Sequence, residues 1–214
     1  MWCPAEGRPN TMNPLNTVRG AITTGVVLAI VIMIIVAALG LTPGSFYELG
    51  LARWLHILSG ITWIGLLFYF NLVQTPGLAA AAADKGGPGG AGIAKYIAPR
   101  ALLWFRWGAV ATWLTGAWYL VRTLNFTNAL TLGHGGKDQY GLIIGIGAWL
   151  GTIMLFNVWV FIWPNQKKIL GIVPASDAEK AAARKTAGMA SRTNFVLSIP
   201  VILCMGSAFH GLPF

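Results

Sequence analysis

The chain has 214 residues, of which 10% are charged and 56% are hydrophobic, and its mean hydropathy is +0.65. Soluble domains carry about 25% charged residues, so this composition excludes an ordinary soluble protein and indicates an integral membrane protein. The net charge of +9 does not indicate nucleic-acid binding, because the basic residues lie between apolar runs, where membrane proteins carry them.

The N-terminal segment 1–15 is expected to be disordered or a mis-called extension, with translation starting at Met12. Residues 16–214 are predicted to form a single transmembrane helical domain. The two cysteines, Cys3 and Cys204, form no CxxC or CxxCH motif. The sequence therefore predicts no disulfide framework, zinc site or covalently attached c-type haem.

Five apolar runs are each near or above the ~20 residues that a helix needs to cross a bilayer. They cover residues 18–41, 49–73, 101–124, 140–163 and 191–212. The segment TPGS (42–45) separates the first two runs, and the prolines of QTPG (74–77) and WPN (163–165) are expected to end the second and fourth helices. Asn157 lies deep in the fourth run and is expected to hydrogen-bond across helices. The predicted fold is an all-α integral membrane bundle of five transmembrane helices.

Two long connections lie between these runs. Residues 80–92 are small and glycine-rich, which predicts a flexible linker. In the second connection, residues 167–190, Ser176 and Glu179 fit a capping box and are followed by alanines, lysines and arginines. We expect a short surface helix there that leads into the last span.

The basic residues predict the orientation. Twelve of the fifteen lysines and arginines lie on the side of the N-terminus and the two long connections, and the other three are Arg53, Arg122 and Lys137. Because positive charge accumulates on the cytoplasmic side, the N-terminus is predicted to be cytoplasmic and the C-terminus periplasmic, in a multi-pass protein of the bacterial inner membrane.

All three histidines are predicted to lie toward the outer face. His56 is about seven residues, or ~10 Å, inside the second span, and His210 closes the fifth. An ionisable group within the hydrocarbon usually faces the bundle interior and marks a functional site. Because neutral imidazole is a common axial ligand of haem iron, we predict that His56 and His210 bind the iron of one haem b.

Neighbours of His56 suit the same site. Arg53 could pair with a haem propionate, Gly60 removes a side chain where a flat macrocycle needs space, and Trp63 continues that face. Other interpretations remain open: His56 could hydrogen-bond a neighbouring helix, and His210 could be an ordinary interfacial residue. Copper or zinc normally needs three or four ligands, and no catalytic residue and no role for the loop residue His134 are predicted.

Four segments carry a family resemblance: RWLHILSGITWIGLLFYF (53–70), WFRWGAVATWLTG (104–116), GTIMLFNVWVFIWPNQKKI (151–169) and ASRTNFVLSIPVIL (190–203). Together they resemble the membrane domain of bacterial membrane-bound urate oxidases, the urate oxidase N-terminal family. The resemblance implies oxidation of urate, with electrons passed to a c-type cytochrome domain fused at the C-terminus. The chain ends at HGLPF without CxxCH, so we expect any cytochrome partner to be a separate chain. The resemblance places His56 and His210 at the histidines of the second helix and of the last motif.

The leading hypothesis is therefore a b-type haem redox protein that passes electrons to a separate cytochrome c and is a candidate for oxidising urate itself. The first alternative is a cofactor-free accessory subunit of a larger respiratory, photosynthetic or monooxygenase complex, held among other membrane subunits by helix packing. The second is a metal-delivery membrane protein. All three have the lipid bilayer as a partner.

Overall fold

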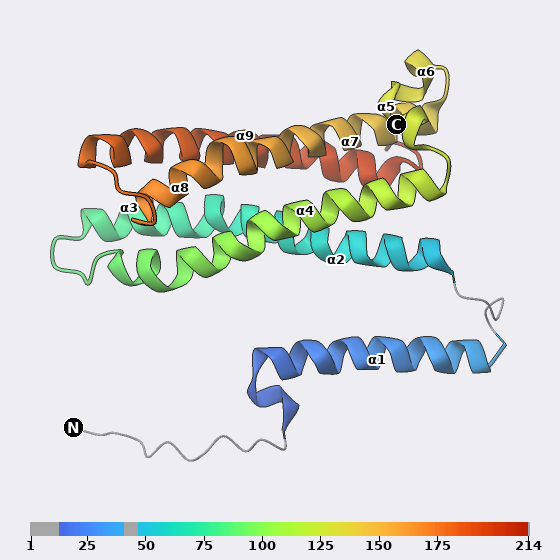
Figure 1. Cartoon of the computed structure of the whole chain (residues 1–214), viewed down its shortest axis with the longest axis horizontal. Helices are drawn as coiled ribbons and strands as arrows, with labels where there is room; N and C mark the ends of the chain where they lie inside the picture. Colours follow the sequence, from blue (N-terminus) through green and yellow to red (C-terminus); the bar gives the residue numbers. More distant parts are fainter. Residues whose placement is uncertain (1–12, 41–46, 214) are drawn as a thin grey trace. The chain divides into compact units, whose positions relative to one another are not determined.

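The computed structural model describes residues 13–40 and 47–213, and helices are the only regular structure in those ranges (Figure 1). Contacts divide the chain into a first unit that ends at Tyr47 and a second that begins at Glu48, and each is described by itself. Most of the N-terminal segment expected to be disordered, residues 1–12, lies outside the described residues.

The first unit contains the apolar helix α1 (Val18–Ala38), preceded by the short 3-10 helix η1 (Pro14–Asn16). Thr17 caps α1, since its hydroxyl accepts a hydrogen bond from the N–H of Gly20 at 3.0 Å. At 1.5 Å per residue, α1 is ~31 Å long, which matches the hydrocarbon thickness of a bilayer. The first predicted span is thus a helix of suitable length and composition.

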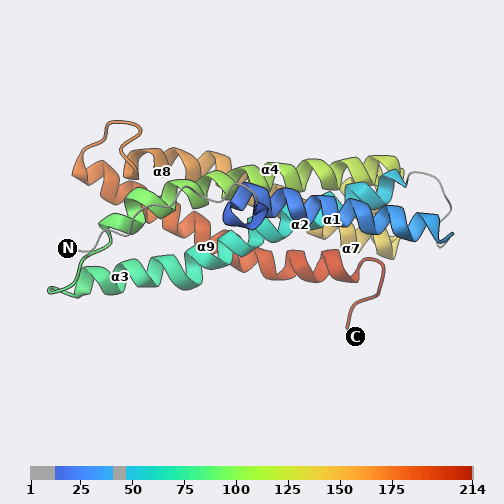
Figure 2. The same cartoon turned by 90° about the horizontal axis from the view of Figure 1, so that it is seen from below.

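In its described residues, the second unit contains four long helical rods and two short helices. The rods run alternately up and down (Figures 1 and 2). The rods are α2–η2–α3 (Glu48–Phe68, Tyr69–Gln74, Thr75–Ala83), η3–α4 (Ile93–Ile97, Ala98–Arg122), α7–η4–α8 (Gln139–Phe156, Asn157–Ile162, Trp163–Ile169) and α9 (Asp177–Ser207). The short helices α5 (Phe126–Leu130) and α6 (Leu132–Gly136) lie at the end where α2 begins and α9 ends, which we call the α5–α6 end (Figure 1). The opposite end is the α3–α8 end.

Four helices of the described residues are long and apolar enough to cross a membrane: Val18–Ala38, Glu48–Ala83, Gln139–Ile169 and Asp177–Ser207. The remaining predicted span corresponds to α4, which has 25 residues but does not reach the same hydropathy. Its tryptophans and threonines, together with Arg106, make it less apolar than its neighbours. The structure therefore supports a membrane protein, and the count of five spans stays a prediction.

The prolines do not end the helices, so the predicted stops at QTPG and WPN are wrong. The rods continue through Pro76 and Pro164, as they do through Pro99, because a π-helical segment (η2, η3 or η4) precedes each proline. A proline lacks the N–H and clashes with the carbonyl four residues earlier, and a wider turn relieves both problems. In each rod the residue before the proline donates to the carbonyl five residues back: Thr75 to Phe70, Ala98 to Ile93 and Trp163 to Val158.

The predicted surface helix in the second long connection is part of α9 rather than a separate element. The capping box at its start is confirmed: Glu179 donates its N–H to the Ser176 hydroxyl, and its carboxylate accepts from the Ser176 N–H at 2.7 Å. From there one helix of 31 residues continues to Ser207.

The core lies where the four rods meet. Its largest fully buried side chains are Leu67, Phe105, Met154, Val158, Asn194 and Ser198. Phe70 of η2 and Phe105 of α4 meet edge to face, with ring centroids 5.5 Å apart. Along the rods α2 pairs with α4, and α7, η4 and α8 pair with α9.

At the α5–α6 end, Asp138 links two elements. Its carboxylate caps α7 by accepting the N–H of Gly141 at 2.8 Å, and it accepts the amide of Asn128 in α5 at 2.6 Å. These hydrogen bonds hold the pKa of the Asp138 carboxyl below its ordinary value of 3.8, and the bond from Asn128 has the largest effect.

Replacing Asp138 by alanine should lower the thermal unfolding temperature in detergent at neutral pH, because α7 loses its cap and α5 its link. A carboxyl whose pKa is depressed by folding stabilises the protein above the unfolded-state pKa, and that contribution is lost as the pH falls through the folded-state pKa. The difference between wild type and Asp138→Ala should therefore be constant above about pH 5 and shrink below about pH 4. A difference that grows with acidification would contradict this cap.

Candidate functional site

His56 lies half-buried in α2 and faces α4. Its Nδ1 is 2.8 Å from the backbone carbonyl oxygen of Thr112. A carbonyl oxygen can only accept, so Nδ1 carries the hydrogen and donates it. In a neutral ring Nε2 then keeps its lone pair, and it makes no hydrogen bond within the described ranges. This tautomer and this type of hydrogen bond are those that orient a metal-ligating histidine.

Glycines let α4 approach the His56 ring. A Cβ atom at Gly116 would lie 2.8 Å from Cε1 of His56, closer than real Cβ contacts allow. A Cβ atom at Gly60 would lie 3.8 Å from a methyl of Thr112. Gly60 therefore faces α4, and the side expected to give space to a macrocycle is the side on which α4 packs.

The other predicted neighbours of His56 lie in different surroundings. Arg53 is exposed and forms no hydrogen bond or ion pair in the part of the chain that the structure describes. Trp63 is only 3% exposed and packs against Gly108, yet its indole N–H has no hydrogen-bond partner among the described residues. Such an orphaned donor on the helix face of His56 is a feature that a bound group could satisfy.

His210 lies beyond the end of α9, in a turn where its N–H donates to the Ser207 carbonyl at 3.2 Å. Its ring is exposed and has no hydrogen bond among residues 13–40 and 47–213. The α5–α6 end of the second unit thus holds both His210 and the first turns of α2, but no interaction in those ranges pairs the rings of His56 and His210.

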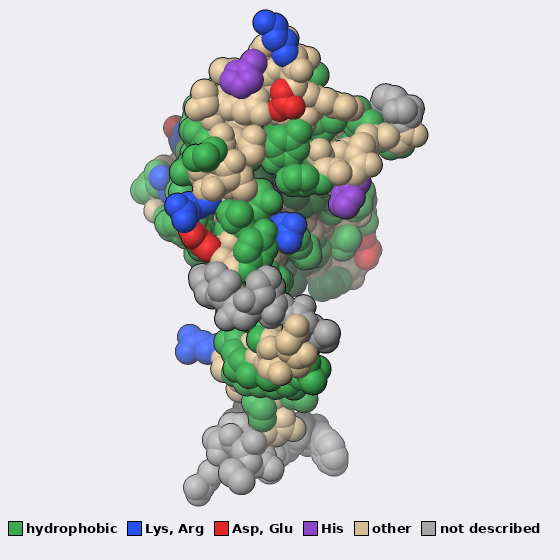
Figure 3. Space-filling view, turned by 90° about the vertical axis from the view of Figure 1, so that its right-hand side faces the viewer, with side chains coloured by type: hydrophobic (Ala, Val, Ile, Leu, Met, Phe, Trp, Pro, Cys, Tyr) green, Lys and Arg blue, Asp and Glu red, His purple; other side chains and the backbone are tan. Residues whose placement is uncertain are grey.

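His134 is also exposed, in α6, where its backbone has a positive φ of 53°. Exposed histidines appear at the surface of this end (Figure 3). In the described part of the chain, no group of three or more His, Cys, Asp or Glu residues could hold a metal ion.

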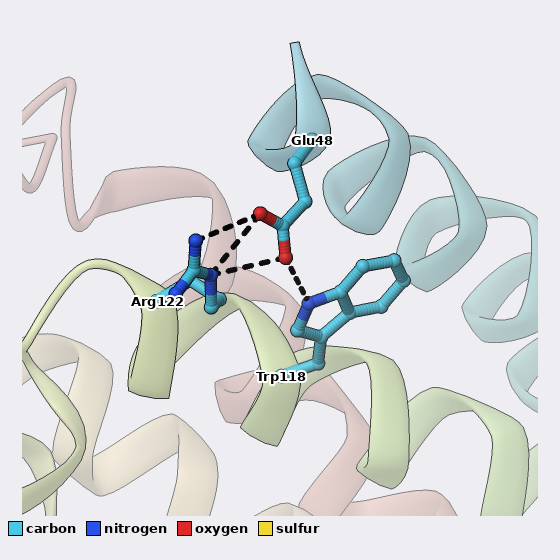
Figure 4. Close-up of polar contacts among 3 residues, drawn as sticks. All are labelled: Glu48, Trp118 and Arg122. Atoms are coloured by element: carbon cyan, nitrogen blue, oxygen red, sulfur yellow. Dashed lines mark hydrogen bonds and ion pairs between the residues drawn. The ribbon is translucent and has the colours of Figure 1, made fainter. Parts of the chain in front are cut away.

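A clamp between α2 and α4 lies two turns before His56 (Figure 4). The carboxylate of Glu48 accepts hydrogen bonds from Arg122, with its closest ion pair at 3.0 Å, and from the indole N–H of Trp118 at 2.8 Å. A bidentate guanidinium–carboxylate pair has a defined geometry, so the clamp fixes how α2 and α4 are aligned. The sequence pattern predicts only that Arg122 is a basic residue on the outer side of the membrane. It does not indicate that Arg122 pairs with Glu48.

A second polar region lies where α9 passes the π-helical segment η4. Asn194 is fully buried; its amide nitrogen donates to the Met154 carbonyl, and its amide oxygen accepts from Asn157, both at 2.9 Å. One turn earlier on α9, the hydroxyl of Ser191 accepts a hydrogen bond from Asn71 of η2 at 3.0 Å. The π-helical segments η2 and η4 therefore each contribute an asparagine that hydrogen-bonds to a side chain of α9.

The prediction that Asn157 bonds across helices is confirmed, whereas Asn71 and Asn194 were not among the predicted residues. Two signals in the sequence could have indicated them. Asn71 precedes a proline inside an apolar run, and Asn194 belongs to the polar motif SRTN (191–194).

Two hollows flank this part of α9. One, of about 230 Å³, is lined by Asn71, Thr75, Pro76, Ala79, Gly188, Ser191 and Arg192. The other, of about 410 Å³, is lined by Asn157, Phe161, Lys185, Thr186, Met189, Ala190 and Thr193. Neither hollow includes His56 or His210.

The helices and their composition define the class as an all-helical protein with candidate membrane spans. The sequence model of the family described as urate oxidase N-terminal matches residues 136–214, which confirms the resemblance for α7, η4, α8 and α9. No curated protein and no solved structure matches the chain. The family match includes the WPNQKK and SRTN motifs and His210, while His56 and its partners on α4 lie outside it.

Asn194→Ala should destabilise the protein by roughly 1–3 kcal/mol, because it removes the acceptor of the Asn157 amide and the side-chain donor to the Met154 carbonyl. Thermal unfolding in detergent measures the change. Ile199→Ala is the matched control on α9, since Ile199 is 55% exposed and its truncation should have a much smaller effect. Equal losses in the two variants would show that the asparagine network adds no stability.

Gly116→Ala should destabilise the α2–α4 pair by roughly 1–3 kcal/mol, because the added methyl group forces the His56 ring away from Thr112. The control is Gly65→Ala on α2, where an added Cβ meets nothing within 4 Å. Gly65→Ala should leave the unfolding temperature unchanged or raise it slightly. If both variants unfold at the wild-type temperature, the ring is not confined as described.

Proposed function

We propose that this chain is a membrane-embedded redox protein, similar over its C-terminal part to the urate oxidase N-terminal family, that binds haem b through His56. The main support is the hydrogen bond from Nδ1 of His56 to the Thr112 carbonyl, which orients the ring and leaves Nε2 as a free electron-pair donor. Haem iron takes imidazole ligands of this kind, and bound haem would supply one-electron chemistry.

The membrane arrangement we propose has five crossings in a bacterial inner membrane, with the N-terminus in the cytoplasm. In support, α4 is ~38 Å long and antiparallel to α2, so it spans the same thickness. Lysines and arginines flank the helix ends on the α3–α8 side, and few lie at the α5–α6 end. The positive-inside rule then makes the α5–α6 end periplasmic.

Within this proposal, each predicted site residue except Gly60 has a defined task. His56 would hold the iron from α2, and His210, at the same end of the bundle, would be the second ligand after a rearrangement of the chain that follows α9. The exposed guanidinium of Arg53 suits a propionate, and the buried N–H of Trp63 suits an acceptor group of the cofactor. A separate cytochrome c would take electrons at the periplasmic end, and urate is the candidate donor.

The close packing around His56 supports a second candidate, a cofactor-free accessory subunit of a larger membrane complex. Gly116 and Thr112 confine the ring against α4, so the hydrogen bond alone could be the task of His56. Cross-helix hydrogen bonds of this kind stabilise membrane bundles by roughly 0.6 kcal/mol on average.

A pyridine haemochrome assay on the purified protein separates the two candidates. We expect reduced haem b bands in wild type, their loss in His56→Ala, and a shifted or weakened spectrum in His210→Ala. His134→Ala is the matched control and should retain the wild-type spectrum, because that ring is exposed in α6.

Each variant is first checked for a wild-type elution profile in detergent, so that loss of haem is not confused with misfolding. A haem-free wild type, or a His56→Ala variant with the wild-type spectrum, would rule out the haem proposal and leave the accessory subunit.

A further inference from the structure

The larger hollow, between η4 and α9, is not used by the proposed redox function. It has a volume of about 410 Å³, within the range of small-molecule sites, and it opens on the surface of the bundle. Asn157 lies at its inner side, where the amide is already bonded to Asn194. Lys185, Thr186 and Thr193 of α9 supply the other polar groups.

These polar groups are free donors. Lys185 has no ion pair or hydrogen bond within the described residues, and no acidic residue lines the hollow. The hydroxyls of Thr186 and Thr193 make no hydrogen bond among the same residues. Lys185 and Thr186 are adjacent on α9, so their ammonium and hydroxyl groups are suited to an oxyanion such as phosphate. Thr193 lies two turns, or ~10 Å, farther along the helix, where its hydroxyl suits an acceptor beyond the phosphate.

The apolar residues of the hollow indicate how that phosphate is carried. Met189 is 57% exposed and Phe161 is 41% exposed, so apolar surface lies beside the donors. A soluble anion would gain nothing from these side chains, whereas the acyl chains of a lipid would contact them.

The hollow also lies at a suitable level along α9. The helix is ~46 Å long, which exceeds the ~30 Å of the hydrocarbon core by several turns. The surplus contains the basic residues Lys180, Arg184 and Lys185, and Lys167 and Lys168 end the adjacent α8. Such a cluster marks the headgroup level of a membrane leaflet, where basic pockets between helices bind anionic lipids.

We propose that the hollow lined by Lys185, Thr186, Thr193 and Asn157 binds the phosphate headgroup of an anionic phospholipid. The ammonium of Lys185 and the hydroxyl of Thr186 donate to the phosphate oxygens, and the hydroxyl of Thr193 donates to an ester oxygen of the glycerol backbone. Phe161 and Met189 contact the acyl chains. The bound lipid would hold η4 against α9 next to the buried asparagine network. This inference is independent of haem binding.

The test is native mass spectrometry of the full-length protein in a neutral detergent, titrated with phosphatidylglycerol or with phosphatidylcholine of the same acyl chains. Wild type should prefer phosphatidylglycerol. Lys185→Gln should weaken that binding by about fivefold, and Thr193→Val, which leaves the charge unchanged, should weaken it as well. Lys180→Gln is the matched control, because Lys180 is on the same helix, pairs with Asp177 and does not line the hollow.

Inorganic phosphate, added at the same concentration as the lipid, should not displace phosphatidylglycerol from wild type. Displacement would overturn the lipid assignment in favour of a soluble phosphate ligand. Equal weakening by Lys185→Gln and Lys180→Gln would show diffuse charge attraction instead of a site. No preference between the two lipids, or an unaffected Thr193→Val variant, would overturn the placement in this hollow.

Discussion

The second unit, which begins at Glu48, depends on keeping its helical rods continuous through proline, because the hydrocarbon core offers no water to unpaired backbone groups. Three of its four rods carry a proline just after a π-helical segment, and the wider turn supplies a backbone hydrogen bond where an α-helix would lose one. The rods therefore extend to lengths that an α-helix broken at Pro76 or Pro164 would not reach.

The same turns organise the interior. An α-helix satisfies nearly all its own carbonyls, but at η4 the carbonyl of Met154 also accepts from Asn194. Asn157 lies in the π segment itself and binds the other end of that amide. A fully buried asparagine is thereby satisfied on both its oxygen and its nitrogen, which apolar packing alone could not achieve. In the helix pair α2–α4, the His56 ring likewise has a partner, because it donates a hydrogen bond to the main-chain carbonyl of Thr112. Gly116 leaves room for the ring between the two helices.

Local patterns predicted much of this fold. The apolar runs predicted the long helices, Ser176 and Glu179 predicted the capping box, and Asn157 was predicted to bond across helices. The helix stops were wrong at Pro76 and Pro164, since a single-residue rule for proline does not account for the π turn that precedes it. The Glu48–Arg122 clamp and the position of Gly116 beside His56 were out of reach, because they depend on how α2 and α4 align in space. Glu48 and Arg122 are 74 positions apart, and no shared periodicity reveals such a pair.

Each π segment also changes the phase of its rod. One additional residue in a turn rotates all later side chains by ~100° relative to an uninterrupted α-helix. A helical-wheel projection drawn across Tyr69–Gln74 or Asn157–Ile162 would therefore misplace every later residue by more than a quarter of the helix circumference. A pairwise alignment to a relative that lacks one of these turns needs a gap of one position inside the helix, at a place where gaps are ordinarily penalised.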